Sequence, residues 1–188
     1  MTPDQHILSF WFTQSGPKKW YAKSDAFDAE IRAKFESMAI DLAAKTSPGP
    51  HPWEDRPESS LSLIIALDQF PRNMYRDTPA AFAWDERARL AAGRMIDKGW
   101  DLKISQDRRA FIYMPYMHSE DLDDQNHCVA LIDSRLDSES SLHHAKAHRA
   151  LIEQFGRFPH RNKILCPLSF LARANNLPTP YRHRLLLL

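Results

Sequence analysis

The chain has 188 residues, of which 43% are apolar and 26% charged, and 25 basic residues nearly balance 24 acidic residues, leaving a net charge of +1. This length suits one domain with a substantial core, and the composition excludes wholesale disorder. The balanced charge excludes the basic stripe of a nucleic-acid-binding protein, and without a basic amphipathic helix nothing favours attachment to a membrane surface.

Glycine and proline usage indicates a helical chain. The sequence contains only 5 glycines but 13 prolines. Few glycines leave few of the positive-φ turns that β-hairpins prefer, whereas prolines between amphipathic stretches suit helices joined by stiff corners. The composition therefore favours an all-α protein.

The first predicted helices lie before residue 45. Asp4–Phe12 is predicted as a short, very apolar helix. Ser24–Ala44 is predicted as a longer helix, because apolar residues recur three or four positions apart along it. This stripe consists of Phe27, Ile31, Phe35, Met38 and Leu42. Ser24 is a suitable N-cap for the helix, and the proline-rich residues 45–56 follow it as a connection.

The middle of the chain contains its most apolar segment. Glu58–Phe70 is predicted as a helix whose centre, Leu63–Leu67, is apolar on all sides and is therefore expected deep in the core. A buried strand is the competing interpretation of so short a run. Pro79 suits a first helical position and opens a helix that continues to about Lys98, with Gly99 as its stop.

Three further helices complete the predicted fold: Gln106–Met117, Asp121 to about Leu136, and Leu142–Phe155. About six to eight helices with short links then form a stack of antiparallel helix pairs, similar to the units of helical-repeat proteins but without a repeated sequence signature. One helical domain is predicted over residues 1–165. Because the regular pattern is lost beyond it, residues 166–188 are predicted to form an irregular C-terminal tail.

The cysteines and the N-terminal residues indicate the compartment. Cys128 and Cys166 match no metal or redox spacing, and a chain without a disulfide framework fits a reducing cytosol. Cys128 is expected to be a buried, inert thiol because its neighbours are apolar. Met1–His6 lacks the features of a signal peptide, and the longest aliphatic run, Leu63–Leu67, is too short to span a bilayer. We therefore expect a cytoplasmic protein, and no oligomeric state is indicated.

Three segments place polar residues behind an aromatic residue and a proline, directly so in the two that carry Arg and Asn. They are Gln69–Asn73, Tyr113–Glu120 and Phe158–Asn162. Because proline lacks the N–H group and pushes its predecessor out of the α region, each aromatic-proline pair is predicted to end a helix. The polar residues that follow would then be held at element ends, where they can converge in one polar cleft.

These segments provide candidates for ligand binding, since an arginine offers a planar fork of donors that suits a carboxylate or phosphate. The candidates are Asp68, Gln69, Arg72, Asn73, Tyr113, Arg157, Arg161 and Asn162. The alternative is structural, with Arg72 capping helix carbonyls or pairing with Asp68. The second arginine cluster can likewise be a buried network whose acidic partners are Asp68, Glu120 and Glu153.

His118, Glu120 and His160 are the candidates for catalysis, because imidazole and carboxyl groups transfer protons as acid and base. His118 and Glu120 could instead bind a metal, but their spacing matches no recognised ligand pattern, so no metal and no cofactor is predicted. Ser119 is explained as the capping residue of the helix that begins near Asp121.

His144 and His148 share one face of a predicted helix. A zinc pair has this spacing, but position 145, where the metalloprotease pattern has glutamate, is Ala145. We therefore expect both histidines on a solvated face. The glycine-rich phosphate loop and the dinucleotide fingerprint are also missing from the sequence, so nucleotide hydrolysis and nicotinamide chemistry have no support.

Longer stretches around the three segments resemble the hallmark segments of the bacterial DUF924 family. These stretches are Leu67–Arg76, Tyr113–Asp121 and Phe155–Asn162, supported by Ile7–Phe12 and Ala81–Asp85. The resemblance covers approximately residues 5–165 and implies a TPR-like helical fold. It implies no catalytic residues, because the family is uncharacterised. The chain departs from the family pattern after Asn162, where Leu165–Ser169 replaces a Leu-Gly-Arg stretch, so an arginine that could join the cleft is missing.

The sequence leaves three functions open. The leading hypothesis is a TPR-like protein that binds a small anionic ligand or an acidic peptide end in a polar-aromatic cleft. The second is a hydrolase-like enzyme that uses histidine and glutamate acid–base chemistry in the same cleft. The third is a protein-interaction scaffold in which the polar residues form a purely structural network.

Overall fold

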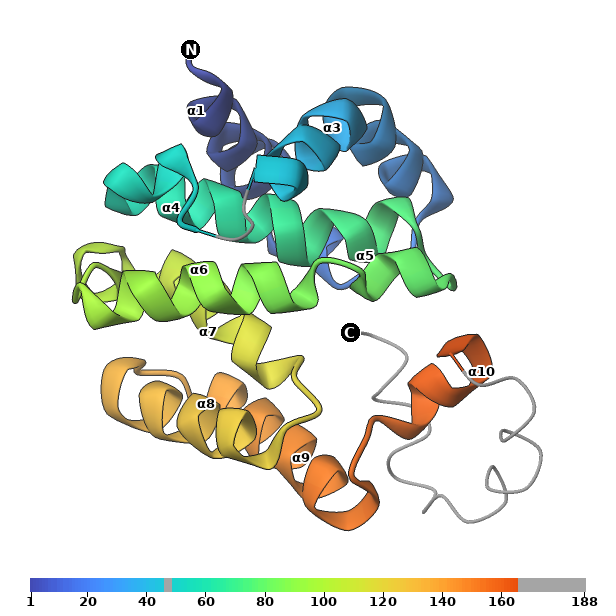
Figure 1. Ribbon diagram of the computed structural model, residues 1–188, viewed down its shortest axis with the longest axis vertical. Coiled ribbons are helices and arrows are strands. Elements are labelled where there is room, and N and C mark those ends of the chain that lie inside the picture. Colours follow the sequence, from blue (N-terminus) through green and yellow to red (C-terminus); the bar gives the residue numbers. More distant parts are fainter. Residues whose placement is uncertain (46–48, 166–188) are drawn as a thin grey trace.

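Every regular element in the residues that this computed structural model describes, 1–45 and 49–165, is a helix, and no strand occurs among them. The predicted all-α class is therefore confirmed. The helices follow one another down the molecule, from α1 and α3 at the top of Figure 1 through α4–α5 and α6 to α8 and α9 at the bottom. The predicted C-terminal tail lies outside the described residues. None of the described helices is long and apolar enough to cross a membrane.

The N-terminal helices confirm the predicted apolar periodicity. Helix α1 (Pro3–Leu8) continues into a wider π-helical segment, Ser9–Ser15, and the short α2 (Pro17–Trp20) follows. Helix α3 spans Asp25–Lys45. The Ser24 hydroxyl accepts the Phe27 N–H at 3.3 Å, as expected of its N-cap. The buried side chains of α3 include Phe27, Ile31, Phe35 and Leu42 from the predicted stripe.

The apolar middle segment is a helix rather than a strand, and its centre is fully buried. Helix α4 (Pro57–Ile64) continues through a π-helical segment, Ile65–Gln69, into α5 (Phe70–Met74). The prediction that Pro71 ends this helix is therefore wrong. In the wider turn the Phe70 N–H donates to the Ile65 carbonyl five residues earlier, and Pro71 follows at a first-turn position of α5, where its missing N–H is tolerated.

The predicted helix from Pro79 to about Lys98 is divided. A 3₁₀ turn, Pro79–Phe82, is followed by α6 (Asp85–Asp97), and Gly99 ends this region with φ of +64°. A further 3₁₀ turn spans Asp101–Lys103.

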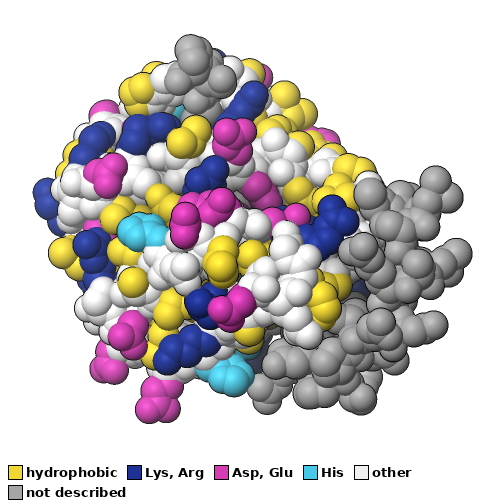
Figure 2. Space-filling model, turned by 60° about the horizontal axis from the view of Figure 1, so that its bottom comes forward, with side chains coloured by type: hydrophobic (Ala, Val, Ile, Leu, Met, Phe, Trp, Pro, Cys, Tyr) yellow, Lys and Arg dark blue, Asp and Glu magenta, His cyan; other side chains and the backbone are white. Residues whose placement is uncertain are grey.

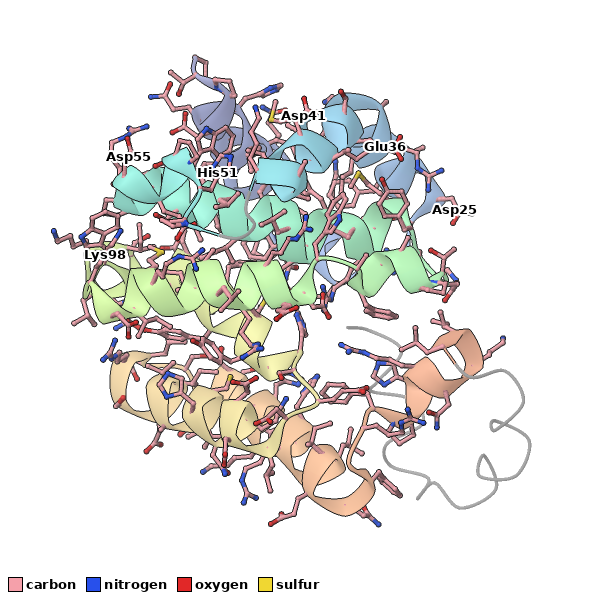
Figure 3. The ribbon with its side chains drawn as sticks, in the orientation of Figure 1. Asp25, Glu36, Asp41, His51, Asp55 and Lys98 are labelled. Atoms are coloured by element: carbon pink, nitrogen blue, oxygen red, sulfur yellow. The ribbon has the colours of Figure 1, made fainter. Side chains whose placement is uncertain are left out.

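The far end of α6 is fixed to the start of α4 by a buried glutamate. Glu54, in the 3₁₀ turn Pro52–Asp55, pairs with Arg94, accepts the His51 N–H at 2.8 Å, and offers its carbonyl to Lys98 Nζ at 2.9 Å. Figure 3 shows His51 beside the start of α4 and Lys98 at the end of α6. Asp85, at the other end of the helix, pairs with Arg72 of α5, so both ends of α6 are held.

The remaining helices match the predicted order. Helix α7 spans Gln106–Met117 and α8 spans Leu122–Arg135. Helix α9 spans Glu139–Phe155, a 3₁₀ turn Pro159–Arg161 follows, and α10 covers Asn162–Leu165.

Two predictions about the ends of these helices are corrected. The predicted bounds Gln106–Met117 match α7, so Pro115 lies inside this helix and does not end it. Phe158, in extended conformation, and Pro159 do separate α9 from the following 3₁₀ turn. The cap of α8 is Asp121, whose carboxylate accepts two backbone N–H groups at 2.8 and 3.1 Å, and not Ser119. The Ser119 hydroxyl accepts the Asp121 N–H at 3.2 Å, before the first residue of the helix, and donates to Asp124 at 2.6 Å.

Candidate functional site

The three polar segments meet at one cavity of about 220 Å³. The predicted residues that line it are Gln69, Arg72, Asn73, His118, His160 and Arg161. They come from the junction with α5, from the C-terminal end of α7, and from the 3₁₀ turn before α10. Segments separated by more than forty residues thus contribute polar groups to the same space.

Asp68 is a fully buried carboxylate beneath the cavity. Its Oδ1 lies 2.8 Å from Nδ1 of His118 and 3.1 Å from Nη1 of Arg72, and its Oδ2 accepts from Gln69 at 2.6 Å. Burial alone would raise the pKa of Asp68, but the charge of Arg72 and the hydrogen bond from His118 outweigh it and lower the pKa to about 2. Asp68 is therefore an ionised acceptor that orients three of the cavity residues.

His118 faces the cavity as a neutral imidazole. Burial, followed by the positive charge of Arg72, lowers its pKa despite the opposing effect of Asp68. Because the ionised carboxylate can only accept, Nδ1 carries the proton of the neutral ring. Nε2 then presents a lone pair, and it has no hydrogen-bond partner among the described residues. This nitrogen can accept a proton or a hydrogen bond from a ligand.

Arg72 is a satisfied cation. Its guanidinium makes a bidentate pair with Asp85 at 2.8 and 2.9 Å and also donates to the Asp68 carbonyl at 2.6 Å. Burial would lower the pKa of Arg72, but Asp68 and Asp85 raise it. The structural partners expected for Arg72 are thus present, with Asp85 as an addition that sequence reasoning missed.

Arg161 is held differently, between two aromatic rings. Its guanidinium carbon lies 4.4 Å from the ring centre of Phe82 and 4.8 Å from that of Phe158. Nη2 donates to the His118 carbonyl at 2.9 Å, but the nearest carboxylates, of Asp85 and Glu120, are 3.7 and 3.8 Å away. Nε is buried without a hydrogen-bond partner among the described residues. Burial, and then the charge of Arg72, lowers the pKa of Arg161.

Two more histidines border the cavity and are held neutral. Burial is the main cause that lowers the pKa of His148 and of His160 to about 4. The ring of Phe158 lies 5.5 Å from each imidazole ring. The expected solvated position is wrong for His148, which is only 4% exposed and whose Nδ1 lies 2.8 Å from the His144 carbonyl. Its face of α9 is covered by Phe158, which the helical pattern alone did not reveal. No group of three or more metal-ligating side chains occurs in the described part of the chain.

The other predicted site residues lie outside the cavity lining. Tyr113 is fully buried and donates to Asp101 at 2.6 Å in a separate polar cluster. Glu120 accepts the Phe158 N–H at 2.9 Å and borders a second, more open hollow together with His118 and Arg161. Arg157 and Asn162 do not line either hollow.

Phe82 and Asp85 belong to the site but were not recognised from the sequence. Both lie between the predicted segments, at the start of α6, and they contact Arg161 and Arg72 respectively. Their only sequence signal was the match of Ala81–Asp85 to the family hallmark, which carried no role for either residue.

The comparisons with known proteins agree with the all-helical fold. Residues 7–169 match the model of a family described as "Bacterial protein of unknown function (DUF924)". The chain belongs to this family. The DUF924 protein is also similar to a solved structure, a protein of unknown function from Agrobacterium tumefaciens, with 39% sequence identity and a TM-score of 0.79. The similarity covers 86% of this chain and 89% of that one. No curated protein matches the sequence.

Proposed function

We propose that this DUF924 protein binds a small anionic ligand, or an acidic peptide end, in the cavity beneath Arg161. The observation that carries the proposal is the incomplete pairing of this buried cation. Its nearest carboxylate oxygens are 3.7 and 3.8 Å away, beyond hydrogen-bond distance. Buried charges are stable when paired and hydrogen-bonded, so an acceptor that enters the cavity would complete the contacts of Arg161.

The other cations of the cavity are less available. Lys23, Arg72 and Arg76 each have a carboxylate oxygen within 3.3 Å. Among the cavity-lining lysine and arginine residues in the described ranges, Arg161 alone has none within 3.5 Å. Arg161 is therefore the group to which an anion would be directed.

The test is calorimetric titration of the full chain and of Arg161→Gln with benzoate, inorganic phosphate and an Asp-Glu dipeptide. We expect the variant to lose at least about tenfold in affinity, because it removes a charge-assisted hydrogen bond. Arg149→Gln is the matched control, since Arg149 pairs with Glu153 and does not line the cavity. Binding that is equal in Arg161→Gln, or absent for all three probes, contradicts the proposal. A lowered melting temperature without any effect of anions would instead favour the structural scaffold.

A second candidate function is acid–base catalysis, favoured by the Asp68–His118 pair. A buried carboxylate fixes the tautomer of an imidazole whose Nε2 is left for the cavity, which is the arrangement of a positioned general base. The predicted partners fit less well. Glu120 is engaged by the Phe158 N–H, and Nδ1 of His160 is buried without a hydrogen-bond partner in the described ranges.

Hydrolysis of 4-nitrophenyl acetate and 4-nitrophenyl phosphate checks this candidate. If His118 is the base, His118→Gln lowers kcat by about 10² to 10⁴-fold, the usual contribution of a positioned proton-transfer group. The exposed His127 provides a control variant, His127→Gln, that keeps the parent rate. Parent hydrolysis that does not exceed the rate of His118→Gln rules out this role.

A further inference from the structure

Building on the proposed anion binding, we infer the chemical class of the ligand: a monocarboxylate with an apolar, preferably aromatic, body. Three features carry this inference, namely the pairing of charges around the cavity, the apolar character of its wall, and its size. Polyphosphates and acidic peptides, which carry several negative charges, fit the same features poorly.

The pairing of the cations around the cavity limits the number of negative charges that a ligand can carry. Of the four lysine and arginine side chains that line the cavity within the described ranges, three have close carboxylate partners. The pairs are Lys23–Asp77 at 3.3 Å, Arg76–Asp28 at 2.6 Å and Arg72–Asp85 at 2.8 Å. His148 and His160 add no positive charge at neutral pH, because burial lowers the pKa of each to about 4. One cation, Arg161, is thus left for one anionic group.

A second negative charge on the ligand would lie close to carboxylates of the protein. The carboxylates nearest to Arg161 are those of Asp85 and Glu120, and Asp77 lines the same cavity. The nearby cation Arg72 is already paired with Asp85. A second anionic group on the ligand would therefore lie near like charges without an unpaired described cation to offset them. Like-charge contacts of this kind act against the wrong ligand, and they select for a single charge.

The apolar wall and the size of the cavity suit the body of the proposed ligand. The side chains that flank Arg161 are the rings of Phe82 and Phe158, and the lining also includes Trp20, Met114 and Ile164. A carboxylate paired with Arg161 would place the rest of the molecule against this apolar surface, where removal from water favours binding. The size agrees, because an apolar cavity of about 150 Å³ is sufficient for benzene, and this one has about 220 Å³.

The experiment compares four probes by calorimetry on the full chain at constant ionic strength: 3-phenylpropionate, 3-phenylpropanol, acetate and pyrophosphate. We expect 3-phenylpropionate to bind at least about tenfold more tightly than each of the others, since it alone combines one charge with an aromatic body. In Arg161→Gln its affinity should fall to that of 3-phenylpropanol, and Arg161→Lys should restore part of the difference. Thermal unfolding verifies that the variants fold, and Arg149→Gln is again the control for a lost positive charge.

The possible failures are distinguishable. Pyrophosphate or acetate binding as tightly as 3-phenylpropionate, in a manner that depends on Arg161, would overturn the ligand class and keep the anion site. Equal binding of 3-phenylpropanol would show that charge is not recognised and would also overturn the inference. Binding of no anionic probe above the level of Arg161→Gln would reject the anion site itself, and the ligand class with it.

Discussion

His148 illustrates how one buried side chain makes the stability of the folded protein depend on pH. It is 4% exposed, and its pKa is lowered to about 4 mainly by burial. The unfolded chain takes up a proton near pH 6.5, whereas the folded chain does so only near pH 4. The contribution of His148 to stability is therefore complete above about pH 6.5 and is lost as the pH falls towards 4.

We predict that His148→Gln reduces this acid sensitivity. Between pH 7 and 4, the unfolding free energy of the variant should decrease by about 3 kcal/mol less than that of the parent protein, because one proton linkage is removed. Urea denaturation at several pH values measures the difference. Parallel pH curves for the two proteins would show that His148 is not the responsible group.

For single residues, the sequence predicted some of the side chains that line the cavity but not their contacts. The repeated Arg-Asn pattern singled out Arg72 and Arg161, and both line the cavity. Their different states could not be predicted, because the bidentate contact of Arg72 and the ring stacking of Arg161 depend on Asp85 and Phe82. Phe82 and Asp85 lie outside both Arg-Asn segments. Their contacts with the two arginines arise only when the helices pack together.

At the scale of elements, apolar periodicity was a better guide than proline. The stripe in α3 predicted that helix to within one residue at each end, since five side chains had to face one core. The two helices that contain Pro71 and Pro115 contradicted the rule that proline stops a helix. The rule concerns local sterics, whereas a wider turn and burial between neighbouring helices can offset the missing hydrogen bond.

The contact between α6 and α7 provides a test of close helix packing. Gly93 lies inside α6, where glycine costs about 1 kcal/mol relative to alanine. A Cβ at this position would lie 2.7 Å from the Tyr116 hydroxyl oxygen but 4.0 Å from the ring carbon that carries it. The hydroxyl group is therefore the part of Tyr116 that requires glycine.

We predict that the effect of Gly93→Ala changes sign with the residue at position 116. In a Tyr116→Phe background the alanine should stabilise the protein by about 1 kcal/mol, its gain in helix propensity. In the parent background the steric contact should cancel or reverse that gain. Urea denaturation of the four proteins in a double-mutant cycle measures the coupling, and additive effects would contradict this account.

At the scale of the molecule, the hydrophobic interior has two parts. The main core extends from α1 to α9, whereas Leu151, Ile152 and Phe158 form a small separate cluster at the end of α9. On the face shown in Figure 2, lysine and arginine side chains are interspersed with acidic ones. Because Phe158 belongs to the small cluster, this cluster holds the segment that carries Arg161. A few polar contacts to the end of α7 also hold it, including Glu120–Phe158 and Arg161–His118.

We predict that Glu120→Ala loosens this segment selectively. The variant removes the acceptor of the Phe158 N–H, a hydrogen bond to a charged group worth about 2 kcal/mol. Amide hydrogen exchange in residues 156–162 should become about tenfold or more faster, while α3 to α5 keep their protection. The exposed Asp133 on α8 offers the control variant Asp133→Ala. Unchanged exchange in residues 156–162 would mean that other contacts hold the segment.

Arg161 lies beside the small cluster and not in the main core. The proposed binding of an anion by Arg161 would therefore affect the local stability of the segment that carries it. An anion that pairs with the guanidinium would add a tether between the 3₁₀ turn that carries Arg161 and the rest of the cavity. The coupling free energy is reciprocal. If binding of the anion stabilises the folded turn by a given free energy, unfolding of the turn weakens the binding of the anion by the same free energy. Occupancy should thus be readable from the protection of a short stretch of backbone, without any probe attached to the ligand.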